Sequence, residues 1–268
     1  VGIGGKVLYG AKGIETIRNI SSLNIRIARE KIGISDKIIT YILNYPDTIY
    51  NTLIISPPQC GKTTLLRIIA GLDEPDSGEV NDSAGLIKGP SRDRGFIFQQ
   101  YSLFPWMTVL DNVVFGLNMC YPDKKEENLE SAKRYLQRVG LEDFQNSYPY
   151  QLSGGMKQRV AIIRSLLNHT PVQLMDEPFS ALDMQTRHTL QEQLIGVWKR
   201  FDTTIVFVTH DVDEAVFLAD KGVVMDKNPG RVKDIVSIDL ERPRKRESTE
   251  FLKIQEEVME SLGVHDME

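Results

Sequence analysis

The sequence predicts an α/β fold in which a mainly parallel sheet is covered by helices on both faces. Short apolar runs alternate with longer segments whose apolar residues recur at helical spacing, a pattern typical of parallel sheets. The run 205–208, Ile-Val-Phe-Val, is apolar throughout, as expected for a strand buried on both faces. In segment 53–70, an apolar run, a loop of small residues and a helical pattern follow one another. This order predicts a strand, a turn and a helix.

Length and composition limit the class of protein. The 268 residues are enough for an α/β domain with a helical insertion. The net charge of −5 argues against a protein-wide nucleic-acid surface. No apolar run is long enough to cross a bilayer, and residues 1–13 lack the pattern of a signal peptide. We therefore expect a cytoplasmic protein in which Cys60 and Cys120 are reduced.

Residues 1–50 indicate a small N-terminal α/β segment. Residues 22–27 alternate between polar and apolar side chains, which predicts a half-buried strand. Ser35 is placed to cap a helix. The apolar face of that helix would consist of Ile38, Ile39, Ile42 and Leu43.

The segment 56–64 lies between a predicted strand and a predicted helix, the context of a phosphate-binding P-loop. In such loops, backbone N–H groups and the helix start face the phosphates. Lys62 would reach the β- and γ-phosphates, and the Thr63 hydroxyl would hold Mg2+. Ser56 replaces the first glycine of the usual pattern. The predicted nucleotide-binding residues are Ser56, Pro57, Pro58, Gln59, Cys60, Gly61, Lys62, Thr63 and Thr64.

Later elements follow from the same periodicities. Residues 95–98 and 172–175 indicate strands, and 105–150 is the most helical region. Gly140 is placed to end a helix there. The predicted buried faces are Ala132, Tyr135, Leu136 and Val139; Met156, Val160, Ile163 and Leu167; Leu190, Leu194 and Val197; and Ile254, Val258 and Leu262.

The string 152–159, Leu-Ser-Gly-Gly-Met-Lys-Gln-Arg, predicts a second helix start that can meet a phosphate. Gly154 and Gly155 leave room for a phosphate beside the backbone, and the Ser153 hydroxyl adds a polar group. An ordinary helix cap is the alternative interpretation.

Acidic residues follow the predicted strand 172–175. Segment 174–183 resembles the Walker B motif of P-loop ATPases running into the D-loop. The resemblance implies that Asp176 at the strand end holds Mg2+ and that Glu177 polarises an attacking water as general base. A solvent-exposed acidic pair is the competing interpretation. Gln173, inside the strand, requires a partner for its amide.

The segments 69–80, 152–159 and 174–183 resemble the ATPases of ABC transporters, and the resemblance covers residues 62–268. It implies a P-loop NTPase fold with an inserted helical subdomain, and ATP and Mg2+ as cofactors. It also implies that Glu177, His210 and Gln99 are catalytic, with Gln100 as the second choice for Gln99. The implied metal ligands are Thr63, Asp176 and Gln99. The implied domains are a core in two parts, 51–104 and 159–240, a helical subdomain, 105–158, and a C-terminal tail and helix, 241–268.

Residues 101–113, with Pro105 and Trp106, and the tail segments 228–232 and 242–244 are similar to those of the nitrate, sulfonate and taurine importers. The resemblance to ABC ATPases implies a head-to-tail dimer with ATP between Lys62 and Thr63 of one chain and 153–155 of the other. It implies permease subunits as partners at the cytoplasmic face of the membrane, a substrate-binding protein as an indirect partner, and no nucleic acid. Trp106 suits docking on the permease, and core packing is the alternative.

Residues 14–67 resemble a different family, the stage III sporulation protein AA ATPases, through 15–30 and 51–67. The two resemblances therefore meet at the P-loop. A sporulation-type secretion ATPase is one alternative function. A chimeric chain without a working adenine pocket is another, because 1–50 do not resemble the strands that carry an adenine-stacking aromatic residue. The tyrosines available there are Tyr41, Tyr45 and Tyr50.

The tail carries a basic run at 242–246. We expect a solvated linker there, with contact to anionic lipid as the alternative.

Overall fold

The computed structural model describes residues 2–10, 13–24, 52–55, 61–82, 85–201, 203–226 and 230–263. For the residues up to 24, for Asp82 and for 197–201, the description covers the backbone only. The chain forms two compact units, 1–32 and 33–268.

The first unit contains an antiparallel hairpin of β1 (Gly2–Gly10) and β2 (Gly13–Asn24). Its register runs from the pair Gly2 and Asn24 to the pair Gly10 and Gly13. Residues 22–24 of the strand predicted at 22–27 belong to β2, and residues 25–27 lie outside the described residues. The helix predicted after Ser35 and the three tyrosines of 41–50 lie outside the described residues.

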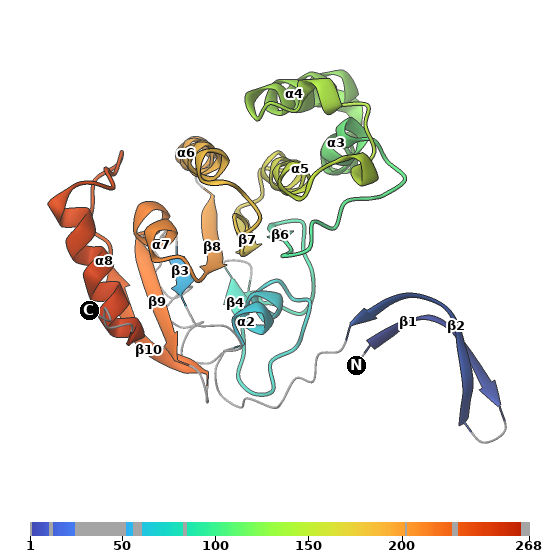
Figure 1. The fold of residues 1–268 in the computed structure, drawn as a ribbon, viewed down its shortest axis with the longest axis horizontal. Coiled ribbons are helices and arrows are strands. Elements are labelled where there is room, and N and C mark those ends of the chain that lie inside the picture. Colours follow the sequence, from blue (N-terminus) through green and yellow to red (C-terminus); the bar gives the residue numbers. More distant parts are fainter. Residues whose placement is uncertain are drawn as a thin grey trace. The chain divides into compact units, whose positions relative to one another are not determined.

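The second unit is built on a six-stranded sheet of order β10-β9-β3-β8-β7-β6 (Figure 1). Neighbours from β9 to β6 pair in parallel, and only the edge strand β10 is antiparallel to its neighbour. This confirms the mainly parallel sheet. The strands are β3 (Thr52–Ile55), β6 (Arg94–Ile97), β7 (Val172–Asp176), β8 (Thr204–Thr209), β9 (Lys221–Asp226) and β10 (Arg231–Ser237), with a separate pair of β4 (Asn81–Asp82) and β5 (Gly85–Leu86).

Helices cover both faces of this sheet, because strand side chains alternate between the faces. On β3, Ile54 packs in one apolar cluster with α2, whereas Leu53 and Ile55 pack in the other with α5, α7 and α8. The strand predicted at 205–208 is buried in the same two-sided way. The helices are α2 (Lys62–Ile69), α3 (Val109–Cys120), α4 (Lys125–Arg138), α5 (Gly154–Leu166), α6 (Met184–Phe201), α7 (Val212–Leu218) and α8 (Thr249–Leu262) (Figure 1).

The helical region after β6 follows the predicted pattern. Ala132 and Leu136 of α4 are fully buried, and Gly140 takes a left-handed φ of 65° just beyond the helix end. The boundaries of the subdomain 105–158 remain a prediction. In the described part of the chain, no helix has both the length and the apolar character required to cross a membrane.

The prediction for the basic run 242–246 is wrong. The Arg244 side chain is only 2% exposed, and Arg242 is 10% exposed. Both guanidinium groups donate to main-chain carbonyl oxygens around the end of α7, including those of Val216 and Leu218. The last carbonyl groups of a helix have no N–H partner within the helix, so buried arginines can satisfy them.

Candidate active site

Four strand ends bring Lys62 and the three predicted catalytic residues to one edge of the sheet. The parallel register sets Ile55 of β3 against Thr209 of β8, and Asp176 of β7 against Val208. Since the carboxyl ends of parallel strands lie at the same edge, the residues that follow them meet there.

Glu177 is the centre of this site. Its Oε1 lies 2.6 Å from Lys62 Nζ and 3.6 Å from His210 Nδ1. Gln99 donates through Nε2 to the other carboxylate oxygen, over 3.3 Å. The structure thus brings together the three residues predicted to be catalytic, and adds Lys62 to them.

The charges around Glu177 favour its ionised form. Partial burial raises the pKa of Glu177, but the hydrogen bond and positive charge of Lys62, together with smaller contributions from His210, outweigh it. The net result is a pKa below the ordinary value for glutamate. Glu177 is therefore an ionised carboxylate that is already paired with Lys62. Its side chain is 13% exposed.

The backbone at Glu177 is strained and firmly held. Its φ of 49° lies in the left-handed region, which non-glycine residues adopt mainly where surrounding contacts enforce it. Its N–H donates to the carbonyl of Val208 in β8, and its carbonyl accepts from the Ser180 hydroxyl. Buried Gln158 of α5 also donates to the carbonyl of Pro178. These bonds fix the carboxylate relative to β8 and α5.

The start of α2 requires a glycine. Gly61 is its N-cap, with φ 89° and ψ 7°, and its carbonyl accepts from the N–H of Leu65. Lys62 is the first residue of the helix, and Thr63 beside it is half-buried. The loop residues Ser56, Pro57, Pro58, Gln59 and Cys60 lie outside the described residues, so their contact with phosphate remains a prediction.

The residues predicted to bind a metal offer a set of oxygen donors. Asp176 ends β7 with 3% exposure, Thr63 carries a hydroxyl, and Gln99 carries an amide. Gln99 donates to Glu177 through its amide nitrogen, so this hydrogen bond does not involve the amide oxygen, which can bind a cation. Carboxylate, hydroxyl and amide oxygens suit a hard divalent cation such as Mg2+.

The second predicted phosphate site, at the start of α5, is exposed. Ser153 and Gly154 face solvent, and the Ser153 hydroxyl accepts from the Met156 N–H as an N-cap. A side chain at Gly154 would meet the Tyr101 hydroxyl at 2.9 Å. Gly154 therefore allows the Tyr101 hydroxyl to lie close to the backbone at the start of α5.

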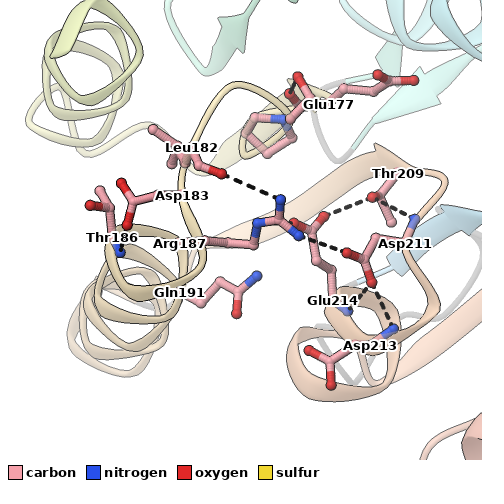
Figure 2. Close-up of polar contacts among 12 residues, drawn as sticks. Glu177, Leu182, Asp183, Thr186, Arg187, Gln191, Thr209, Asp211, Asp213 and Glu214 are labelled. Carbon is pink, nitrogen blue, oxygen red and sulfur yellow. Dashed lines mark hydrogen bonds and ion pairs between the residues drawn. The ribbon is translucent and has the colours of Figure 1, made fainter. Parts of the chain in front are cut away.

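A network between α6 and α7 was not predicted from the sequence (Figure 2). Arg187 of α6 binds Asp211, the N-cap of α7, over 2.8 Å, and lies 3.6 Å from Glu214. Thr209 donates to Glu214 over 2.7 Å. Burial raises the pKa of Glu214 to about 7. The available signal was three acidic residues, Asp211, Asp213 and Glu214, directly after a buried strand, because such a group needs nearby cations.

The amide of Gln173 finds partners within the core. It donates to Ser165 over 2.6 Å and accepts from Thr170 over 3.2 Å. This departure from an apolar strand is therefore structurally satisfied.

Comparison with known proteins identifies the family. The chain is 55% identical over 209 residues, 78% of each protein, to an uncharacterised ABC transporter ATP-binding protein of Methanocaldococcus jannaschii. The chain belongs to the ABC transporter family. It is 48% identical over 217 residues to a nitrate import ATP-binding protein of Synechocystis, covering 78% of this chain and 81% of that one. It is 44% identical over 207 residues to an aliphatic sulfonates import ATP-binding protein of Bacillus cereus, covering 77% and 81%.

Solved structures agree with this assignment. A dimeric ATP-binding cassette in a post-hydrolysis state, bound to ADP and Pi, matches with a TM-score of 0.64 and 34% identity. The match covers 72% of this chain and 89% of that cassette. This ABC chain is thus an ATPase with the P-loop NTPase fold.

Two family models match the sequence. The ABC transporter model matches residues 51–180, and the model of sporulation stage III protein AA matches residues 1–84. Their overlap, 51–84, contains the P-loop, so the meeting of two resemblances at this element is confirmed.

Proposed function

We propose that this chain hydrolyses ATP at the carboxyl edge of its sheet, with Glu177 as the general base. The observation that supports this is the convergence of Lys62, Gln99 and His210 on the two oxygens of one carboxylate. Lys62, with the loop before it, would bind the β- and γ-phosphates. His210 would contact the γ-phosphate, and Gln99 would contact the metal.

The ion pair between Lys62 and Glu177 suggests how binding prepares catalysis. An incoming phosphate competes with Glu177 for the Lys62 ammonium group, which lies 2.6 Å from the carboxylate. Loss of that partner removes the largest contribution that lowers the pKa of Glu177, so the effect of burial is less compensated and the pKa rises. A carboxylate with a higher pKa accepts a proton from water more readily.

Mg2+ fits the oxygen donors of Thr63, Asp176 and Gln99, with Asp176 binding directly or through water. When bound, it would neutralise charge on the phosphates. The chain's own residues would hold the nucleotide, orient the water and accept its proton.

The exposed start of α5 supports a site shared between two copies of the chain. Ser153, Gly154 and Gly155 would donate backbone and hydroxyl hydrogen bonds to ATP held by the P-loop of the second copy. Hydrolysis would then require closure of a head-to-tail dimer, because these donors reach the phosphates only when the two copies meet.

The relatives suggest the transport partner and the substrate. We infer that the chain drives uptake of a small anion such as nitrate, a sulfonate or taurine, with a substrate-binding protein as an indirect partner. Its place would be the cytoplasmic face of the membrane, against permease subunits. Trp106 is 69% exposed, so it does not pack in the core as the alternative required. It lies beside Phe104, which contacts Phe115, and offers an apolar anchor for the permease.

The permease contact is tested by capture on the tagged chain. We expect Trp106→Ala to reduce the permease recovered in detergent, and Leu252→Ala, at an exposed position of α8, to leave it unchanged. Equal recovery with both variants would refute this docking surface.

Calorimetry with Mg-ATP tests the nucleotide site itself. Binding by the wild-type chain that is lost in Lys62→Ala would support the proposal. Absence of binding in both would favour a chimeric chain without a working adenine pocket.

The match of residues 1–84 to the sporulation family favours a second candidate, a secretion ATPase that assembles as a ring. Light scattering on the purified chain separates the two candidates. Ring-sized particles without a permease would support the second, whereas a monomer that becomes a dimer with ATP would support the first.

A further inference from the structure

Helix α7 is the element on which the position of His210 depends. It has seven residues and begins at Val212, two residues after His210, with Asp211 as its cap. A helix this short is marginal by itself, so its place is set by tertiary contacts. The His210 side chain is 59% exposed, and packing around the ring does not hold it.

The C-terminal segment holds the end of α7. Arg244 donates to the carbonyls of Val216 over 2.7 Å and Ala219 over 2.5 Å. Arg242 donates to the carbonyl of Leu218 over 2.7 Å and pairs with Asp220. Burial lowers the pKa of Arg244 to about 10, which leaves it charged at neutral pH.

Arg246 of the same segment holds the start of α7. Its Nε lies 2.8 Å from Asp213 in the first turn, and its Nη2 donates to Gln191 over 2.5 Å. Its guanidinium carbon lies 3.7 Å from the centre of the Phe217 ring, in the last turn. Gln191 belongs to α6 and is fully buried. Arg246 therefore joins both turns of α7 to α6.

Helix α6 begins directly after Asp183, and the short segment 178–183 connects it to Glu177. Arg187, one turn before Gln191, binds Asp211 and donates to the carbonyl of Leu182. Figure 2 shows the side chains of Arg187 and Gln191 pointing from α6 toward α7. Two arginines, one from α6 and one from the C-terminal segment, thus bridge these helices beside His210.

We propose that Arg246 is a positioning residue for ATP hydrolysis, through which the C-terminal segment sets α7 and thereby the place of His210 beside Glu177. The inference rests on the proposed role of His210. The 3.6 Å between His210 Nδ1 and Glu177 is the geometry that this contact would maintain. A displacement of about 1 Å at such a site can reduce turnover by up to about a hundredfold.

The test compares Arg246→Gln with Lys245→Gln, which makes the same charge change at the exposed neighbouring residue. We expect Arg246→Gln to lower kcat on the order of tenfold and to change KM for ATP less than about twofold. Lys245→Gln should change neither. Asp213→Asn removes the same ion pair from the other side, and it should lower kcat similarly even if Arg246→Gln does not fold.

A second measurement reports the position of His210 directly. Modification by diethyl pyrocarbonate is followed by mass spectrometry, with His169 as the internal reference. We expect the rate at His210, relative to His169, to change at least about twofold in Arg246→Gln or Asp213→Asn and to stay constant in Lys245→Gln. A general loss of stability is recognised separately, because unfolding would raise the absolute rate at half-buried His169.

Either of two results would overturn the proposed role of Arg246 without affecting the proposed function. The first is an unchanged kcat in both Arg246→Gln and Asp213→Asn, and the second is an unchanged modification ratio in both. In either case, a wild-type chain that hydrolyses ATP and loses turnover in Glu177→Gln would leave the proposed function intact. A Glu177→Gln chain that keeps full turnover would overturn both.

Discussion

The starts of α2 and α5 are each suited to bind an anion, and they differ in burial and in the side chains that contact them. At the start of α2, Lys62 is buried and paired with Glu177 over 2.6 Å. At the start of α5, Ser153 and Gly154 are exposed, and the serine hydroxyl binds an amide of its own helix. The first start adjoins the groups that can react with water, whereas the second offers only donors.

This difference teaches how hydrolysis can be made conditional. Within one chain, Lys62, Gln99 and His210 already lie against Glu177, and Lys62 and Glu177 form an ion pair. The exposed start of α5 can stabilise charge only on a nucleotide that approaches from outside. A site that combines the start of α2 from one chain with the start of α5 from another would be active only in a dimer.

The largest expected effect comes from breaking the site around Glu177. Glu177→Gln removes the proposed general base, and we expect kcat for ATP to fall about 10²–10⁴-fold while ATP binding persists. Steady-state turnover with calorimetry measures both. Glu192→Gln, the same change at an exposed position of α6, is the control. A Glu177→Gln chain with normal turnover would show that the water is activated elsewhere.

Glu214 extends the comparison, because it is a buried acid of α7, close to the strand end that carries His210. Its pKa of about 7, against an ordinary 4.5, means that the folded state binds its proton more tightly than the unfolded state. The corresponding stability is present below pH 4.5 and is lost as the pH rises through 7, by about 3 kcal/mol. Urea unfolding at pH 4.5 and 8 should show this loss for wild type and not for Glu214→Gln. Parallel pH profiles would contradict the assignment.

The next effect concerns the positive charge at the start of α2. Lys62→Ala removes a charge-assisted contact worth about 1.5–3 kcal/mol, so we expect Mg-ATP to bind about 10- to 100-fold more weakly in calorimetry. Lys88→Ala, at an exposed position, should bind like wild type. Equal affinity of Lys62→Ala and wild type would place the phosphates elsewhere.

The smallest effect distinguishes the two roles of Ser153. Ser153→Ala loses the cap of α5 and should lower the free energy of unfolding by about 1 kcal/mol. Ser153→Asp keeps a capping oxygen and should unfold like wild type in urea. Equal loss of stability in both variants would mean that capping is not what the hydroxyl provides.

The sequence was sufficient where position along a strand determines position in space. Asp176 ends a buried strand and His210 follows another, so a parallel sheet had to bring them to one edge. The periodic apolar residues of α4 predicted its buried face for the same reason, since 3.6 residues complete a turn.

The sequence was insufficient where side chains reach across the fold. A run of basic residues looks the same whether it is solvated or buried, and only the placement of α7 gives Arg244 its carbonyl partners. The bond between Arg246 and Gln191 likewise joins segments 55 residues apart. The left-handed backbone of Glu177 is imposed by its neighbours, because glutamate does not prefer it.

ATP-dependent association of the Glu177→Gln chain tests most directly whether the two helix starts form one site. Sedimentation should show a monomer without nucleotide and a dimer with Mg-ATP. Ser153→Asp in the same background keeps its cap but sets a negative charge against the incoming phosphate, so it should bind ATP and remain a monomer. Dimers that form equally well with Ser153→Asp would contradict a site shared between the two copies.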